Sequence, residues 1–156
     1  MRYTFTPPPG WSRAPFPPPQ RGVYLRAPVP TPAADSASIL LFEEVTPIGT
    51  LEQQLAQIVQ EGCQPGKITK SGKPAPVKTR SFPALSQSVA VTVPGSPRAR
   101  DELRVFVLVE GGSERLPVMF IGGPKSLPAH QAALEALIAS ITTIQIAPGL
   151  YTRFVE

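Results

Sequence analysis

Residues that could do chemistry are few in this chain, and they are scattered. His130 is the single histidine, and no second histidine, cysteine pair or carboxylate cluster stands near it in the sequence, although a metal site or histidine-based proton transfer usually needs one. Glu43 and Glu44 are adjacent on a predicted strand, so their side chains point to opposite faces and form no local acid–base pair. We therefore predict no catalytic residue, no metal site, no cofactor and no enzymatic activity.

Serine and glycine motifs give no stronger case for catalysis. Ser113 and Ser126 lack the Gly-x-Ser-x-Gly context of a nucleophile elbow. Residues 122–125 (GGPK) lack the spacing of a phosphate-binding loop, and their proline removes one amide that would hold phosphate. The enzyme alternative would require a cleft in which His130, Glu135 or another carboxylate converge with a shifted pKa.

Charge is distributed unevenly along the chain. The formal net charge is +4, which is modest for 156 residues. Residues 62–100 nevertheless contain no Asp or Glu and seven basic residues, namely Lys67, Lys70, Lys73, Lys78, Arg80, Arg98 and Arg100. Such a segment can contact an acidic protein or nucleic-acid phosphates, or it can be a solvated basic loop. Phe82 is its sole aromatic residue, which argues against a platform that stacks single-stranded nucleic acid.

Strands must position most of these residues. Residues 37–45 carry apolar side chains at both alternating sets of positions, which is typical of a central strand that is covered on both faces. Residues 64–76 are rich in Gly, Pro and Lys and indicate a turn or mobile hairpin. The predicted strands are residues 22–27, 37–45, 77–82, 86–93, 103–110, 115–121 and 142–147.

Two helices are predicted. Thr50 and Gln53 have the spacing of a capping box, which starts a helix that ends near Glu61. The second helix begins at Pro128, because proline is well tolerated in the first turn, and it extends to Ile141. The apolar stripes of the two helices are Leu51, Leu55, Ile58 and Val59, and Leu134, Leu137, Ile138 and Ile141.

Proline marks the organisation of the chain, because ten of the 21 prolines lie within the first 32 residues. Proline fixes φ and lacks an amide donor, so this part should be extended, with Trp11 and Phe16 pinning it to the domain. A PxxP ligand for an SH3-like partner is the alternative, but the basic residues flank the wrong register. We predict a proline-rich extended segment packed on the domain at 1–35, an α+β core at 36–147 and a tail at 148–156.

The sequence shows neither a targeting signal nor a pair of cysteines. The amino terminus has no apolar stretch suited to a signal peptide, and no run of eighteen apolar residues occurs. We therefore predict a cytoplasmic protein with no membrane span. Cys63 is the single cysteine, so an intrachain disulfide is excluded, and a small buried hydrophobic residue is the ordinary explanation for it.

The order of the predicted elements gives, on pattern alone, a two-layer α+β domain with an antiparallel sheet and two packed helices. Residues 3–11 (YTFTPPPGW), 50–55 (TLEQQL) and 130–141 (HQAALEALIASI) resemble the PsbP/DcrB-like superfamily, which also contains a Ran-binding nuclear import factor and type VI secretion effector chaperones. The resemblance spans about residues 3 to 142. It implies a PsbP-like sandwich of two or three layers and a mostly non-enzymatic role in which the protein binds through a sheet, and we expect a bacterial protein. No functional residue is carried over from it.

The sheet face opposite the helices is a second candidate surface. If both helices cover one face, Phe106 and Leu108 lie exposed on the other face beside Arg104. We therefore predict an intracellular adaptor, chaperone or assembly subunit, in which this face supplies affinity and the basic segment selects an acidic protein partner. Nucleic-acid or polyanion binding through residues 67–100 is the alternative.

Overall fold

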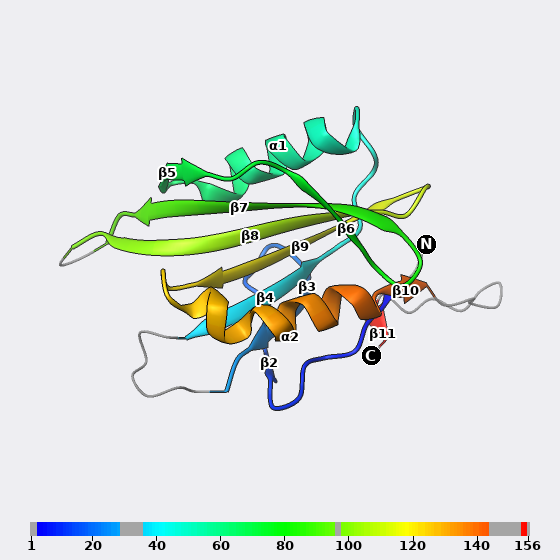
Figure 1. Ribbon diagram of the computed structural model, residues 1–156, viewed down its shortest axis with the longest axis horizontal. Coiled ribbons are helices and arrows are strands. Elements are labelled where there is room, and N and C mark those ends of the chain that lie inside the picture. Colours follow the sequence, from blue (N-terminus) through cyan, green and yellow to red (C-terminus); the bar gives the residue numbers. More distant parts are fainter. Residues whose placement is uncertain (1–2, 29–35, 96–97, 144–153, 156) are drawn as a thin grey trace.

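A computed structural model describes residues 3–28, 36–95, 98–143 and the backbone of 154–155. Its main sheet has eight antiparallel strands in the spatial order β2-β3-β4-β9-β8-β7-β5, with β6 also paired to β7 (Figure 1). The strands are β2 (Ser12–Ala14), β3 (Gly22–Arg26), β4 (Ala37–Phe42), β5 (Lys67–Ser71), β6 (Ala75–Lys78), β7 (Pro83–Val93), β8 (Arg100–Glu110) and β9 (Arg115–Gly122).

The middle strands are apolar on both sides. β4 lies between β3 and β9, which confirms the central position predicted for residues 37–45. In β8, Val105 and Val107 belong to one core cluster and Phe106 and Leu108 to the other. Successive side chains of a strand point to opposite faces, so this sheet needs apolar cover on both of them.

One helix covers each face, and the two are offset. α1 (Leu51–Cys63) packs over β7 and β8, whereas α2 (Ser126–Ser140) packs over β4 and β9. Figure 1 shows the strands running between the two helices. The fold is therefore an α+β sandwich of three layers, and the two-layer arrangement predicted from pattern alone is wrong.

The helix boundaries follow the predicted caps closely. Thr50 accepts a hydrogen bond from the amide of Gln53, whose side chain accepts one from the amide of Thr50, so the predicted capping box is present. α2 begins at Ser126, two residues before the predicted start. Pro128 lies in the first turn, where the missing amide costs no intrahelical hydrogen bond.

Residues 64–76 differ from the prediction of a turn or mobile hairpin. The segment contains the edge strand β5, and β6 begins within it at Ala75, both paired antiparallel with β7. The register shifts between Ile68 and Lys70. Lysines, prolines and a bulge are devices that keep an exposed edge from pairing with another chain, so a composition that looks like a loop suits an edge strand.

The amino-terminal segment contributes to the core on the α2 side. β1 (Tyr3–Thr4) pairs with β10 (Thr142–Thr143) and with β11 (Phe154–Val155). Tyr3 and Phe5 are buried, and Trp11 packs against the same cluster. Of the strand predicted at 142–147, the described part is β10; the loop at 29–35 and most of the tail lie outside the described residues.

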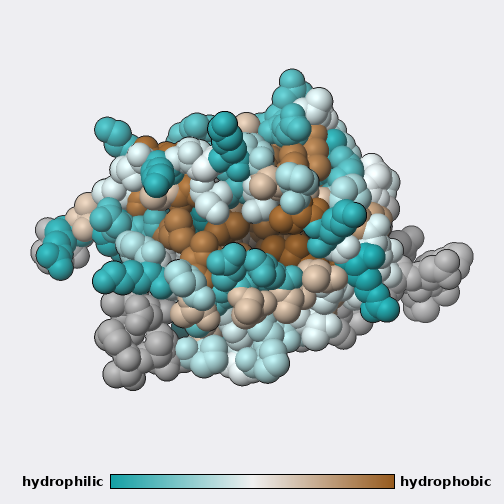
Figure 2. Space-filling view, viewed as in Figure 1, coloured by the Kyte–Doolittle hydropathy of each residue, from teal (hydrophilic) through white to brown (hydrophobic). Residues whose placement is uncertain are grey.

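The offset of the helices leaves half of each face less covered. On the α2 side this half lies over β8 and β7, and Figure 2 shows an apolar band there beside α2. Val105 and Val107 on this side are only 5% and 2% exposed, so these two side chains add little to the surface. Among the described residues, no helix is both long and apolar enough to cross a membrane.

Candidate functional site

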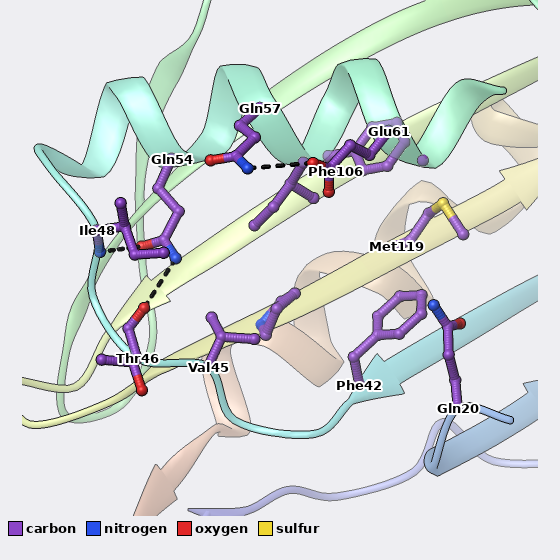
Figure 3. A pocket seen from close by; sticks show the side chains of 13 residues that line it. Gln20, Phe42, Val45, Thr46, Ile48, Gln54, Gln57, Glu61, Phe106 and Met119 are labelled. Carbon is purple, nitrogen blue, oxygen red and sulfur yellow. Dashed lines mark hydrogen bonds between the residues drawn. The ribbon is translucent and has the colours of Figure 1, made fainter.

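On the α1 side, the half of the sheet that α1 does not cover forms the floor of a groove of about 380 Å³, and α1 forms one of its walls (Figure 3). Gln54, Gln57 and Glu61 project from α1, opposite Phe42 and Met119 on the sheet. The lining residues are Gln20, Phe42, Val45, Thr46, Ile48, Gln54, Gln57, Ile58, Glu61, Gly62, Phe106, Pro117 and Met119.

The floor of the groove is apolar and continues beyond it. Phe42 of β4 meets Phe16 edge to face, with ring centroids 5.4 Å apart. Tyr24 of β3 and Ile121 of β9 are partly buried against the same core cluster. Because β3, β4 and β9 are neighbours, these side chains extend the apolar surface across the strands.

Ile48 stands at one end of the groove. Its exposed fraction is 61%, and it is the one large hydrophobic residue that is exposed among the described residues. Ile48 lies in the loop between β4 and α1, and its amide donates to Gln54 Oε1 at 3.2 Å. One exposed aliphatic side chain is ordinary by itself, but Ile48 adjoins the apolar lining of the groove and so enlarges a continuous apolar surface.

A buried polar network holds this end in place. Arg115 of β9 forms an ion pair with Glu110 at 2.8 Å and donates to Gln54 Oε1 at 2.7 Å and to the carbonyl of Gly49 at 3.2 Å. Gln54 Nε2 donates to the carbonyl of Thr46 at 3.0 Å. Buried polar groups are stable when their hydrogen bonds are made, so this network fixes the loop that carries Ile48.

The rim at the other end of α1 is acidic. Gln57 Nε2 donates to Glu61 Oε1 at 3.1 Å, across one turn of the helix. Of the described residues that line the groove, Glu61 alone carries a charge. The site therefore combines an apolar floor, amide groups on its walls and one carboxylate.

The predicted basic residues lie away from the groove. α1 stands over β7 and β8, between the groove and the β5–β6 edge. Arg100 is 70% exposed and pairs with Glu102 at 2.9 Å. The exposed basic side chains on or near that edge and the start of β8 are Lys67, Lys70, Lys73, Lys78, Arg80, Arg98 and Arg100.

The expectation that Phe106 and Leu108 lie on an open sheet face is wrong. They are 2% and 0% exposed, because α1 packs on that side of β8; Phe106 reaches only the groove floor. Arg104 is also largely covered. Its guanidinium donates to Glu102 at 2.8 Å and to the carbonyl of Gly62.

The carboxyl of Glu102 pairs with two arginines, Arg100 and Arg104, and they lower its pKa. Burial would by itself raise the pKa of this carboxyl, but the hydrogen bonds and charges of Arg104 and Arg100 outweigh it and hold the pKa below its ordinary value. The three side chains form a charged ladder at the start of β8. This ladder gives Arg100 and Arg104 contacts within the domain, and their predicted contact with a protein partner stays a prediction.

The residues weighed for catalysis do not converge on a cleft. His130 of α2 lies against Trp11, with ring centroids 5.5 Å apart, and Glu135 is exposed and accepts from Gln131. Neither lines the groove. No group of three or more His, Cys, Asp or Glu side chains that could hold a metal occurs in the part of the chain that the structure describes.

Sequence reasoning missed the residues that build the groove. Met119 and Gln54 looked like ordinary strand and helix positions, and Arg115 like the start of a strand. Arg115 and Gln54 are 61 residues apart, so no local pattern connects them. One signal was available: residues 27–66 contain five acidic residues and no basic one, and they include the loop and helix that form one wall.

No family model matches this chain, and neither does any curated protein. Solved structures share its fold at low identity. A Pseudomonas aeruginosa protein of unknown function, described as a regulator, matches with a TM-score of 0.65 at 15% identity, over 87% of this chain and 99% of its own. LpqN, involved in cell envelope biogenesis of Mycobacterium tuberculosis, matches with 0.59 at 10%, over 90% and 82%.

Cyanobacterial PsbP (CyanoP) from Synechocystis sp. PCC 6803 matches with a TM-score of 0.51 at 12% identity, over 91% of this chain and 86% of its own. The PsbP-like fold implied by the sequence resemblance is therefore confirmed. The likeness to the DcrB, Ran-binding and secretion-chaperone members stays a prediction. At these identities the comparisons establish the fold alone.

Proposed function

We propose that this protein is a non-catalytic binding module, an adaptor, chaperone or assembly subunit, that holds an apolar segment of a protein partner in the groove beside α1. The observation that carries the proposal is an apolar groove with an exposed Ile48 at its end. A pocket of this kind, apolar with a few placed polar groups, is the default binding site of a domain.

A polypeptide suits the site better than a small compact ligand. The apolar floor continues from the groove across β4 and β3 through Phe42, Phe16 and Tyr24, so the surface is elongated. Gln20 and Gln57 supply amide groups from opposite walls. Side-chain amides can pair with the peptide groups of a bound chain, which would otherwise lose their hydrogen bonds to water.

The probe for this proposal is a short apolar peptide whose first and last residues are glutamine and whose terminal amino and carboxyl groups are chemically blocked. The chain has two methionines, so labelling their methyl groups with carbon-13 gives two signals, and Met119→Leu assigns the one from the groove floor. We expect the peptide to shift the Met119 signal. The proposal is refuted if apolar peptides leave this signal unchanged.

Ile48→Ser is the variant that tests the groove directly. Because Ile48 is largely exposed, its loss should not disturb folding. Losing the contact of one isoleucine should cost about 1–2 kcal/mol of binding, or about fivefold to thirtyfold in affinity. Ala132→Ser, on the exposed surface of α2, is the matched control and should bind like the unmodified protein.

The lysines of the β5–β6 edge are a second candidate contact, for an acidic region of a protein partner. Lys67, Lys70, Lys73 and Lys78 are exposed, and none forms an ion pair with another described residue. An uncompensated row of charges attracts a partner of opposite sign and speeds its association. Nucleic-acid binding through the same row is the other outcome that an association experiment would reveal.

A further inference from the structure

We infer that the apolar segment held in the groove carries a cationic residue, Lys or Arg, beside its apolar stretch, and that this residue lies at Glu61. The inference rests on the proposed function. It specifies the chemistry of the partner at one end of the groove. Three independent features of the charge distribution support it.

The first feature is the sequence that forms the α1 wall. Between Arg26 and Lys67 there is no basic residue, while the chain as a whole has a net charge of +4. Glu52 and Glu61 lie on α1 and are exposed. A wall without basic residues attracts a cationic segment and repels an anionic one.

The second feature is the position of Glu61 on its helix. Glu61 lies in the last turn of α1, and this turn contains no basic residue. The carboxyl end of a helix carries a partial negative charge, which favours cations there and disfavours carboxylates. Glu61 therefore adds a negative charge where the helix already has one, and a cation bound at this point would interact favourably with both.

The third feature is the way the carboxylate is held. Gln57 donates to Glu61 Oε1 at 3.1 Å, and Glu61 forms no ion pair with another described residue. Arg104 is the cation beneath this end of α1, but it is already bonded to Glu102 and to the carbonyl of Gly62. Arg104 therefore forms no ion pair with Glu61, and the carboxylate is available to a partner.

The chain contains a matched control for Glu61. Glu135 on α2 accepts from Gln131 at 3.0 Å, with the same four-residue spacing as Gln57 and Glu61, and it is also exposed. It does not line the groove. Glu61→Gln and Glu135→Gln therefore remove the same charge from the same kind of Gln–Glu pair, one in the last turn of α1 and one in the middle of α2. Of the two variants, Glu61→Gln alone changes the groove.

The experiment compares three blocked peptides that share one apolar sequence and end in lysine, glutamine or glutamate at both ends. Affinity is measured from the Met119 methyl signal in low salt. We expect the lysine peptide to bind about threefold to tenfold more tightly than the glutamate peptide, the range of one or two exposed ion pairs. This preference should vanish in Glu61→Gln, persist in Glu135→Gln and shrink as salt rises.

Each result has a separate meaning. If all three peptides bind equally, or if the lysine preference survives in Glu61→Gln, the cationic inference is overturned while the groove proposal stands. If no peptide shifts Met119, both are overturned. If the protein self-associates in sedimentation and Ile48→Ser separates the copies, a second copy occupies the groove and the inference is overturned.

Discussion

Replacing Arg115 with methionine should loosen the Ile48 end of the groove. Arg115→Met keeps much of the aliphatic length of the side chain, and it removes the guanidinium that pairs with Glu110 and donates to Gln54 and Gly49. The side chain of Arg115 is 8% exposed and that of Glu110 is 28% exposed. The variant therefore removes this partner from two uncharged acceptors, Gln54 Oε1 and the carbonyl of Gly49, and from one partly hydrated carboxylate.

The expected cost follows from these exposures. Removing one partner of a buried ion pair costs about 3–5 kcal/mol, and the partial hydration of Glu110 lowers this to about 2–4 kcal/mol. With a urea dependence of about 2 kcal/mol per molar for a domain of this size, the midpoint of unfolding should fall by about 1–2 M. A domain with ordinary stability should remain folded in water.

Urea unfolding and amide hydrogen exchange are the two assays. Arg100→Met is the control, because Arg100 also pairs with a carboxylate but is 70% exposed, and it should cost at most about 1 kcal/mol. The amide of Ile48, which bonds Gln54, should exchange faster in Arg115→Met by more than the loss of global stability explains. Equal midpoints for the two variants, or unchanged relative exchange at Ile48, would refute the role assigned to the network.

Two further predictions concern charged groups outside the groove. The triple variant Lys67→Glu, Lys70→Glu and Lys73→Glu should slow association with an acidic peptide about tenfold in low salt. The control Lys125→Glu changes an exposed side chain near α2 and should alter the rate little. Equal association rates for both variants would count against the β5–β6 contact, and tight, steeply salt-dependent binding of duplex DNA would indicate nucleic acid instead. The pKa of Glu102 is lower in the folded chain than its ordinary value of 4.5, so its contribution to stability is present above that value and is lost as pH falls through the folded pKa. The difference in urea midpoint between the unmodified protein and Glu102→Gln should therefore shrink as the solution is acidified from about pH 7 to about pH 3, and a constant difference would contradict the assigned shift.

Much of the local structure could be predicted because it depends on neighbours in sequence. The capping box at Thr50 and Gln53 involves residues three apart, and the structure contains it. The two alternating apolar sets of residues 37–45 required cover on both faces, and β4 is central. Residues 64–76 were the main local failure, since Lys, Gly and Pro are typical both of loops and of protected edge strands.

The binding site predicted from charged and apolar residues agrees less well with the structure. The basic residues of 62–100 are exposed as expected of a charged segment, but Arg104 is largely covered and paired with Glu102, and Phe106 and Leu108 are in the core. The error has one cause. The exposure of a β8 side chain depends on which face of the sheet each helix covers. The residues of β8 are apolar on both faces, so the strand by itself does not indicate the covered face.

The amino-acid sequence by itself determined the elements: their apolar periodicity, their caps and turns, and an acidic stretch between two basic ones. These are properties of residues within a few positions of one another. The tertiary structure alone decided that α1 and α2 take opposite faces, offset from each other, and so decided that a groove exists beside α1. An apolar stripe on a helix requires an apolar surface to pack against, and a sheet that is apolar on both sides offers two, so the choice rests on packing across the whole chain.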